Sequence, residues 1–318
     1  MDIIYNKIFL EHDTGMHPEN KKRLMVCDGL SESRLVNGEP YLNLVHDEAY
    51  INHIKLFCQK GGHLDGDTVV SEKSYETAIY AVGATIAAAE SGGFALVRPP
   101  GHHAHPGQSS GFCIFNNVAI AVAHLLKKKK RVLILDFDGH LGDGTEKIFY
   151  ANGQVLYWSL HQYPAFPYWG TEDQIGEGRG KGFTVNVPLP PGSGDDVFFE
   201  AFDLLIPVAE QFAPDVVAVS AGFDAHQYDL LLDLHLSANA FYRIGKTLRE
   251  KFSNIFATLE GGYNIEMFPR CLKNFIRGIN GERIFYEETA TDSTIQVVNE
   301  FQLRLGALEK NLAPYWKL

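Results

Sequence analysis

The feature that most constrains this chain is a series of short, almost wholly apolar segments, each followed by polar residues. They are FALVRP (94–99), RVLILDFD (131–138), VLYWSL (155–160), FTVNVPL (183–189), VVAVSAGFD (216–224) and IFATLEGG (255–262). Segments of this length with hydrophobic residues at nearly every position are typical of strands buried on both faces of a parallel sheet. We therefore expect the chain to build a central parallel sheet.

Helical patterns lie between many of these segments. Patterns typical of helices occupy 74–90, 195–212, 237–252 and 293–308. No repeat or long linker divides the chain, so the alternation of strands and helices predicts one α/β domain over residues 1–318. Helices are expected on both faces of its sheet.

The charge, the apolar runs and the cysteines of the chain argue against some kinds of binding partner and some cellular compartments. The net charge of -11 argues against nucleic acid as a general partner. No apolar run approaches the roughly 20 residues of a membrane helix, and the first residues do not form a signal peptide. The four cysteines show no paired spacing and are Cys27, Cys58, Cys113 and Cys271. Disulfides and a cysteine zinc site are therefore not expected, and a reducing cytoplasm fits.

Polar side chains follow four of the predicted strands at the point where each strand ends. The four continuations are DFDGHLGDG, PPGHHAHPG, FDAHQYD and GGYN. Ligands bind beyond the carboxyl ends of parallel strands, because those ends meet at one edge of the sheet. Aspartate, histidine and tyrosine side chains are therefore expected to converge on one rim.

The motif Asp136-x-Asp138-x-His140 is suited to holding a metal ion. Asp138 and His140 alternate, so both face the same way on an extended segment. With Asp224 from another strand end, one imidazole and two carboxylates would suit a catalytic zinc or a similar divalent ion. Asp136 would support these ligands or bind a further cation. Taken alone, the motif is also compatible with a polar turn after a strand.

Two other strand ends offer groups for proton transfer. An imidazole of the pair His102 and His103 would take a proton from water and return it to a leaving group. Tyr263 follows two glycines and would donate its hydroxyl to a developing oxyanion. His105 has no comparable support and is expected to be a loop residue.

Together these segments resemble the zinc-dependent histone deacetylase superfamily, in its prokaryotic, class II-like branch with acetylpolyamine amidohydrolases and acetoin-utilisation-type proteins. The matching segments, in family order, are HDTGMHPENKKRL (12–24), RPPGHHA, SGFCIFNN, DFDGHLGDGT, SLHQ, GKGFTVNVPLP, SAGFDAH and LEGGY. They cover about residues 2–280. The resemblance implies a single arginase-like α/β domain, with a helical extension over 281–318 that has no assigned function.

The resemblance also implies a role for each matched residue. The zinc ligands would be Asp138, His140 and Asp224. His103 would be the main general base and acid, and His102 would tune it electrostatically. The carboxylates behind these histidines, and the hydroxyl that polarises the acyl carbonyl, would be those of Asp136, Asp143 and Tyr263.

A structural potassium ion and a substrate channel are implied in the same way. The potassium ligands would be the side chains of Asp136, Asp138 and Ser159 with the backbone carbonyls of His140 and Leu160. The acyl-lysine channel would be lined by Gly111, Phe112, Tyr168 and Gly261. Asp67 would grip the substrate backbone at the rim, and Arg23 would lie deep in the pocket.

One position departs from the family pattern, since Leu141 stands where many members have a second histidine. That position is not a metal ligand, so the departure bears on local packing and substrate preference. The tyrosine at 263, which some branches replace, is kept. We therefore expect an active enzyme.

The sequence predicts a zinc amidohydrolase that removes acetyl or other acyl groups from lysine side chains of a peptide or protein. The nearest alternative is an acetylpolyamine amidohydrolase, which would act on small acetylated amines. An arginase-like hydrolase with two manganese ions would need more bridging carboxylates, for which Asp229 is a spare acid. A non-catalytic acyl-lysine reader would be expected to lack Tyr263 or a zinc ligand.

Overall fold

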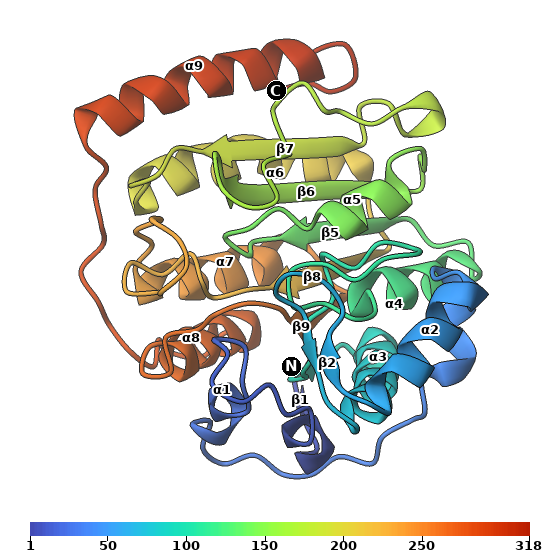
Figure 1. Ribbon diagram of the computed structural model, residues 1–318. Helices are drawn as coiled ribbons and strands as arrows, with labels where there is room; N and C mark the ends of the chain where they lie inside the picture. Colours follow the sequence, from blue (N-terminus) through green and yellow to red (C-terminus); the bar gives the residue numbers. More distant parts are fainter.

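A seven-stranded sheet forms the centre of the protein, as the computed structural model of residues 1–318 shows (Figure 1). In spatial order its strands are β1 (Ile3–Ile4), β4 (Phe94–Ala95), β9 (Ile255–Leu259), β8 (Val216–Ala221), β5 (Val132–Asp136), β6 (Val155–Gln162) and β7 (Thr184–Leu189). All neighbouring strands are parallel, as predicted. A separate antiparallel hairpin consists of β2 (Gly62–His63) and β3 (Val69–Val70).

The central strands are buried along their lengths because they pair on both sides and are covered on both faces. Every residue of β5 is buried, including the terminal Asp136. In register, Asp136 lies beside Ser159 of β6 and Ser220 of β8. The apolar runs therefore bring polar side chains from three adjacent strands to the same level of the sheet.

Nine α-helices and three short 3-10 helices connect the strands. The α-helices are α1 (Lys22–Met25), α2 (Glu48–Cys58), α3 (Ser74–Ser91), α4 (Asn117–Leu126), α5 (Asp143–Phe149), α6 (Asp195–Phe212), α7 (Ala238–Lys251), α8 (Phe268–Asn280) and α9 (Ile295–Leu312). The 3-10 helices are η1 (Lys7–Leu10), η2 (Glu39–Leu44) and η3 (Gly178–Gly180). None of these helices has the length and hydropathy needed to cross a bilayer.

The direction of each crossover determines which face a helix covers. The chain moves across the sheet one way through α4 and α5, and the other way through α6 and α7. Because such crossovers are right-handed, these two pairs of helices lie on opposite faces. α3 packs against α4, and α8 packs against α7 (Figure 1). Helices therefore cover both faces, as predicted.

Most segment boundaries follow the sequence patterns closely, but the helix expected at 293–308 runs from Ile295 to Leu312, and one strand is shorter than expected. The helices expected at 74–90, 195–212 and 237–252 begin and end within one residue of those bounds. Of the apolar segment 94–99, only Phe94–Ala95 pairs in the sheet. The prolines that follow at 99 and 100 lack the N–H group that a longer strand would need.

The C-terminal extension packs along the β7 edge of the sheet (Figure 1). The apolar side of α9 is buried through Phe301, Leu305, Leu308 and Leu312. Arg304 of this helix donates hydrogen bonds to the backbone oxygens of Tyr163 (2.7 Å) and Pro188 (3.2 Å). Asn311 donates to the carbonyl of Glu172 at 2.9 Å. The extension thus covers the exposed sheet edge and holds the loop that follows β6.

Candidate metal centre and active site

Three buried side chains from two strand ends form a compact cluster of metal-ligand type. They are Asp138 and His140, which follow β5, and Asp224, which follows β8. His140 Nδ1 lies 3.2 Å from Asp138 Oδ1 and 2.8 Å from Asp224 Oδ2. One ligand atom from each residue lies within 4.8 Å of the other two. The predicted ligands are therefore brought together.

The chemistry of this cluster fits a divalent cation. Two carboxylates and an imidazole are the ligands of a catalytic zinc site. Burial raises the pKa of Asp224, and the neighbouring charge of Asp138 raises it further. Two buried like charges are costly without a cation between them. The three residues therefore fit the metal that the sequence predicts.

Glycines allow the backbone to approach this cluster closely. A Cβ on Gly222 would lie 2.0 Å from Asp138 Oδ2, and one on Gly261 would lie 2.6 Å from the same atom. The Gly261 N–H donates to Asp138 Oδ2 at 2.7 Å, and the Gly139 N–H donates to Asp224 Oδ1 at 2.8 Å. These backbone bonds orient both carboxylates, so the glycines position the cluster.

The tandem histidines each pair with a carboxylate, as the family resemblance implies. His102 Nδ1 lies 3.1 Å from Asp136 Oδ2, and His103 Nδ1 lies 2.7 Å from Asp143 Oδ1. The two imidazole rings are 4.0 Å apart. Because Nδ1 of each ring is engaged, Nε2 of each ring is left for chemistry. His102 Nε2 faces the metal cluster at 3.8 Å from Asp138 Oδ1.

The two histidines have opposite electrostatic surroundings. Burial lowers the pKa of His103 to about 4, and the charge of His102 acts in the same direction. Burial also acts to lower the pKa of His102, but the carboxylates of Asp138, Asp136 and Glu260 outweigh it and raise that pKa well above its ordinary value. Neighbouring groups whose pKa values are driven apart suit separate acid and base roles.

Asp143 contacts two imidazoles instead of the one expected. Its Oδ2 lies 2.8 Å from His105 Nε2, while its Oδ1 pairs with His103. Burial raises the pKa of Asp143, but the hydrogen bonds from both histidines outweigh it and hold that pKa well below the usual range. His105 lies in a loop, as expected, and its imidazole shares the Asp143 carboxylate with His103.

Tyr263 follows β9, so a third strand end contributes to the site. Its ring packs edge-on against Phe112 at 5.8 Å, and the guanidinium of Arg23 lies 4.9 Å from its centroid. Asp229 Oδ2 accepts hydrogen bonds from the N–H groups of Tyr263 (2.7 Å) and Asn264 (2.9 Å). Asp229, the spare acid considered for a second metal ion, therefore binds the backbone of Tyr263 and its neighbour.

A fully buried network of charged side chains supports the backbone turn that precedes Tyr263. Arg23 donates to the carbonyl oxygens of Gly262 and Glu260, both at 2.6 Å. Glu19 pairs with Arg23 at 3.1 Å and with Arg98 at 2.8 Å, and all three side chains are completely buried. Arg23 therefore lies deep in the site, as expected. Glu19 and Arg98 were missed, although they stand within the matched motifs HPENKKR and RPPGHH.

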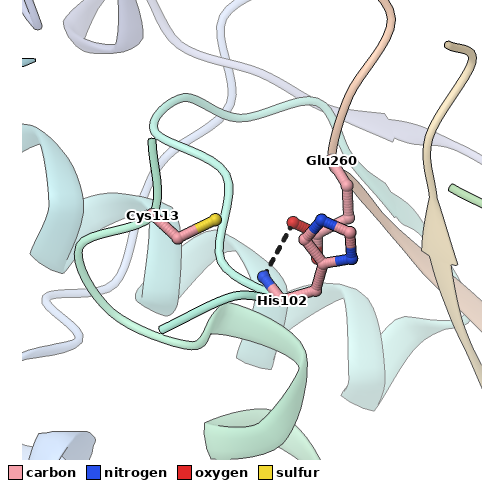
Figure 2. Close-up of side chains that lie close together, drawn as sticks. All are labelled: His102, Cys113 and Glu260. Carbon is pink, nitrogen blue, oxygen red and sulfur yellow. Dashed lines mark hydrogen bonds between the residues drawn. The ribbon is translucent and has the colours of Figure 1, made fainter. Parts of the chain in front are cut away.

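Glu260 fixes the turn that carries the tandem histidines (Figure 2). Its Oε2 accepts hydrogen bonds from the N–H groups of Gly101 at 2.7 Å and His102 at 3.1 Å. Ligand atoms of His102, Cys113 and Glu260 also lie within 4.8 Å of one another. Burial raises the pKa of the Cys113 thiol well above its usual value, so the sulfur stays protonated and is a poor metal ligand. We interpret this group as structural.

Aromatic rings surround His103 and Tyr263. Phe112 packs on Tyr263, and Phe166 packs on His103 with 5.0 Å between ring centroids. Gly111 has a φ of +52° and contacts His103, where a Cβ would lie 2.4 Å from the ring. Tyr168, expected as the wall opposite Phe112, is 72% exposed.

Phe166, two positions before Tyr168, is therefore the aromatic side chain of this loop that contacts His103. The Tyr168 N–H donates to the carbonyl of Ala165 at 2.6 Å, and the φ of Tyr168 is 62°. This tight turn directs the tyrosine outward and brings the phenylalanine two positions earlier onto the histidine. Sequence reasoning missed Phe166 because a turn of this kind changes which side chain faces inward.

Asp67 and Leu141 are not part of the cluster formed by Asp138, His140 and Asp224. Asp67 is exposed in the β2–β3 hairpin, where its N–H bonds Asp65 Oδ1 at 3.1 Å. Thr68 of the same hairpin accepts a hydrogen bond from Phe112 N at 3.2 Å, so the hairpin contacts the segment that carries Phe112. Leu141 is completely buried and packs into the apolar core.

The residues predicted to hold potassium lie in the paired strands β5 and β6 and in the segment directly after β5. Asp136 and Ser159 are neighbours in register, and Leu160 is the next residue of β6. The Asp138 N–H donates to Asp136 Oδ1 at 3.2 Å. Tyr157, which was not predicted, places its hydroxyl 3.2 Å from Asp136 Oδ2. Asp136 is thus shared between a histidine, a tyrosine and the start of the metal-binding segment.

Comparison with known proteins places this site in one family. A model of the histone deacetylase domain matches residues 17–279. A probable deacetylase of Archaeoglobus fulgidus is 39% identical over 292 residues, covering 83% of this chain and 81% of that protein. A histone deacetylase-like amidohydrolase of Pseudomonas aeruginosa is 36% identical over 292 residues, covering 84% and 77%.

A relative from a plant and a solved structure agree with these matches. Histone deacetylase 14, chloroplastic, of Arabidopsis thaliana is 35% identical over 317 residues, covering 86% of this chain and 75% of that protein. The crystal structure of the HDA15 HD domain superposes with a TM-score of 0.89 at 28% identity, covering 99% of this chain and 94% of that one. The chain therefore belongs to the histone deacetylase family of amidohydrolases, and its fold is the arginase-like α/β fold of that family.

Proposed function

We propose that the protein is a zinc-dependent deacylase that removes acetyl or other acyl groups from lysine side chains. The observation that carries the proposal is the buried cluster of Asp138, His140 and Asp224 beside two histidine–aspartate pairs. When held by these three residues, zinc would act as a Lewis acid on the amide carbonyl. The other groups of the site are arranged to move protons and to stabilise charge around that position.

His103 is suited to act as the general base. Its Nδ1 bond to Asp143 fixes the tautomer, so Nε2 is free to take a proton from the attacking water. The low pKa of His103 keeps the ring uncharged near neutral pH. The resulting imidazolium would then protonate the departing amine, and the Asp143 carboxylate would stabilise it meanwhile.

Tyr263 is suited to donate a hydrogen bond to the oxyanion. Burial raises the pKa of its phenol well above the ordinary value, and the charges of Asp224 and Asp138 add to that effect. The hydroxyl therefore stays protonated and remains a donor. Arg23 against its ring and Asp229 on its backbone hold it in place.

The lysine assignment is supported by the aromatic surroundings. Phe112 and Phe166 lie beside Tyr263 and His103 respectively, which suits the thin aliphatic stem of an acylated lysine. We also propose a structural potassium ion at Asp136, Asp138 and Ser159 with the carbonyls of His140 and Leu160. The pairing of β5 with β6 at this level supports that site.

A matched substrate panel tests the proposal. Zinc-loaded protein would be assayed on acetyl-lysine peptides, longer acyl-lysine peptides and N-acetylated polyamines. Peptide turnover should fall about 10²–10³-fold in Tyr263→Phe, since one oxyanion donor is lost. Tyr168→Phe removes a hydroxyl from an exposed tyrosine of the same rim and should leave turnover unchanged.

Other results would redirect the assignment. Turnover restricted to the polyamines would make the small acetylated amines the substrates. Two manganese ions per chain in metal analysis, with no deacylation, would revive the arginase-like alternative. Peptide turnover that survives in Tyr263→Phe would contradict the proposed role of the tyrosine.

A further inference from the structure

A cavity of about 300 Å³ lies beside Asp143 and His105. We call it the side cavity, and it is lined by His105, Asp143, Glu146, Tyr150, Pro167 and Trp169, with Lys147 also present. None of these residues belongs to the proposed zinc cluster. Since Pro167 directly follows Phe166, one loop separates the side cavity from the proposed acyl-lysine channel.

Two carboxylates with spare acceptor capacity form the polar part of the side cavity. Glu146 is only 2% exposed, and its Oε1 accepts a hydrogen bond from Asn186 Nδ2 at 2.7 Å. The Trp169 indole also favours the ionised form of Glu146. Each oxygen of Asp143 carries a single imidazole contact, although a carboxylate oxygen has two acceptor sites. Both acids therefore retain lone pairs for a cationic donor.

The rest of the lining is apolar and aromatic. Tyr150, Pro167 and Trp169 contribute ring surfaces, and Trp169 is 55% exposed. Aromatic faces attract organic cations, and indole does so most strongly. A bare metal ion would make no use of these rings. A cavity lined by both carboxylates and aromatic rings is therefore complementary to an ammonium group that carries an alkyl chain.

We propose that the side cavity binds an alkylammonium ion. Its ammonium group would lie between Asp143 and Glu146, and its alkyl chain would pack on Tyr150, Pro167 and Trp169. Lys147 is exposed and opposes such a ligand by charge. Binding at this place does not depend on the proposed hydrolysis, so the two proposals are tested separately.

Calorimetric titration of the full-length protein with n-butylammonium chloride tests this inference, with potassium chloride as the ionic-strength reference. Wild type should bind with a dissociation constant in about the millimolar range, as expected for so small a ligand. Glu146→Gln keeps the size of the side chain but removes the charge, and should weaken binding about tenfold. Trp169→Ala should weaken it about threefold, and Lys147→Ala should strengthen it.

Two variants of the same loop serve as matched controls. Tyr168→Ala and Glu172→Gln change an aromatic ring and a carboxylate that do not line the side cavity, so binding should match wild type. Trp169 is largely exposed, so its variant tests the inference even if Glu146→Gln folds poorly. Equal affinity in wild type and both cavity variants, or equal losses in the controls, would overturn the proposal.

The pH dependence of binding gives a second, independent readout. Burial, together with the charge of Asp143, raises the pKa of Glu146 to about 7. The other titratable groups that face Glu146 or share its cavity are Lys147, Tyr150, Tyr157 and His105. Glu146 gains its charge as the pH rises through this value, so binding should strengthen between about pH 6 and 8. An unchanged pH dependence in Glu146→Gln would contradict the assignment.

Discussion

The buried Glu19 carboxylate should be one of the most sensitive positions in the protein. It contacts Arg98 Nη2 at 2.8 Å and Arg23 Nη1 at 3.1 Å, and none of the three side chains is exposed. Glu19→Gln preserves the shape but leaves two buried guanidinium groups without their counter-charge. Breaking a buried ion pair from one side costs about 3–5 kcal/mol, so the free energy of unfolding should fall by about that amount.

Urea unfolding measures this change, and an exposed pair provides the control. Lys251 and Glu210 lie 3.0 Å apart with side chains that are 41% and 44% exposed. Glu210→Gln removes the same charge at a similar distance and should produce no resolvable change, because exposed pairs contribute little. If both substitutions shifted the urea midpoint equally, the argument from burial would be wrong.

The Glu19 carboxylate should also make the free energy of unfolding depend on pH in the acid range. Burial raises the pKa of Glu19, but Arg98 and Arg23 outweigh it and lower the value to about 2. A depressed carboxyl pKa stabilises the fold above the unfolded value of 4.5, and that contribution is lost as the pH falls towards 2. The difference between wild type and Glu19→Gln should therefore shrink across this window.

Three further changes test other parts of the molecule. Gly261→Ala should weaken zinc affinity at least about tenfold, as measured by chelator competition. The added Cβ would lie 2.5 Å from the Asp224 carboxylate and 2.6 Å from the Asp138 carboxylate. Unchanged affinity would argue against this cluster as the zinc site. Asp143→Asn should lower kcat about 10²–10⁴-fold, since an amide offers one acceptor to two imidazoles; a kcat within about threefold of wild type would count against this. Burial lowers the pKa of His12 to about 3 and of His46 to about 4, so each is uncharged when folded and protonates on unfolding below pH 6.5. The free energy of unfolding should therefore fall by about 1–2 kcal/mol per histidine from pH 7 to 5, and His46→Gln should flatten this slope.

Much of the fold was predictable because its signals are local. Strand patterns are continuous apolar runs, so the inner strands were found from the sequence, and three helices were placed within one residue. The edge strand β1 was not predicted, because a two-residue pairing of Ile3–Ile4 leaves no pattern longer than chance. The hairpin at 62–70 was missed for the same reason.

The residues of the site could be predicted where they follow strands, but not where they lie in irregular loops. Asp138, His140 and Asp224 come together as expected, because parallel strand ends share one edge of the sheet. The second partner of Asp143 and the inward ring of Phe166 depend on how irregular loops turn, which no periodicity records. Glu260 was missed because a buried acid that only braces backbone N–H groups is indistinguishable in sequence from a surface acid.

The helix α9 gives this protein a place where the shape of the proposed pocket can change separately from its proposed catalytic groups. The histone deacetylase domain match ends at residue 279, so this helix lies outside the segment that defines the family. Yet Arg304 and Asn311 bond the backbone at Tyr163 and Glu172, on either side of Phe166 in the loop after β6. Mutations in this helix, which contains none of the proposed catalytic residues, should therefore shift the loop that carries Phe166 and leave the proposed zinc ligands and proton-transfer groups in place. For protein engineering, this makes the C-terminal helix an adjustable support for substrate preference.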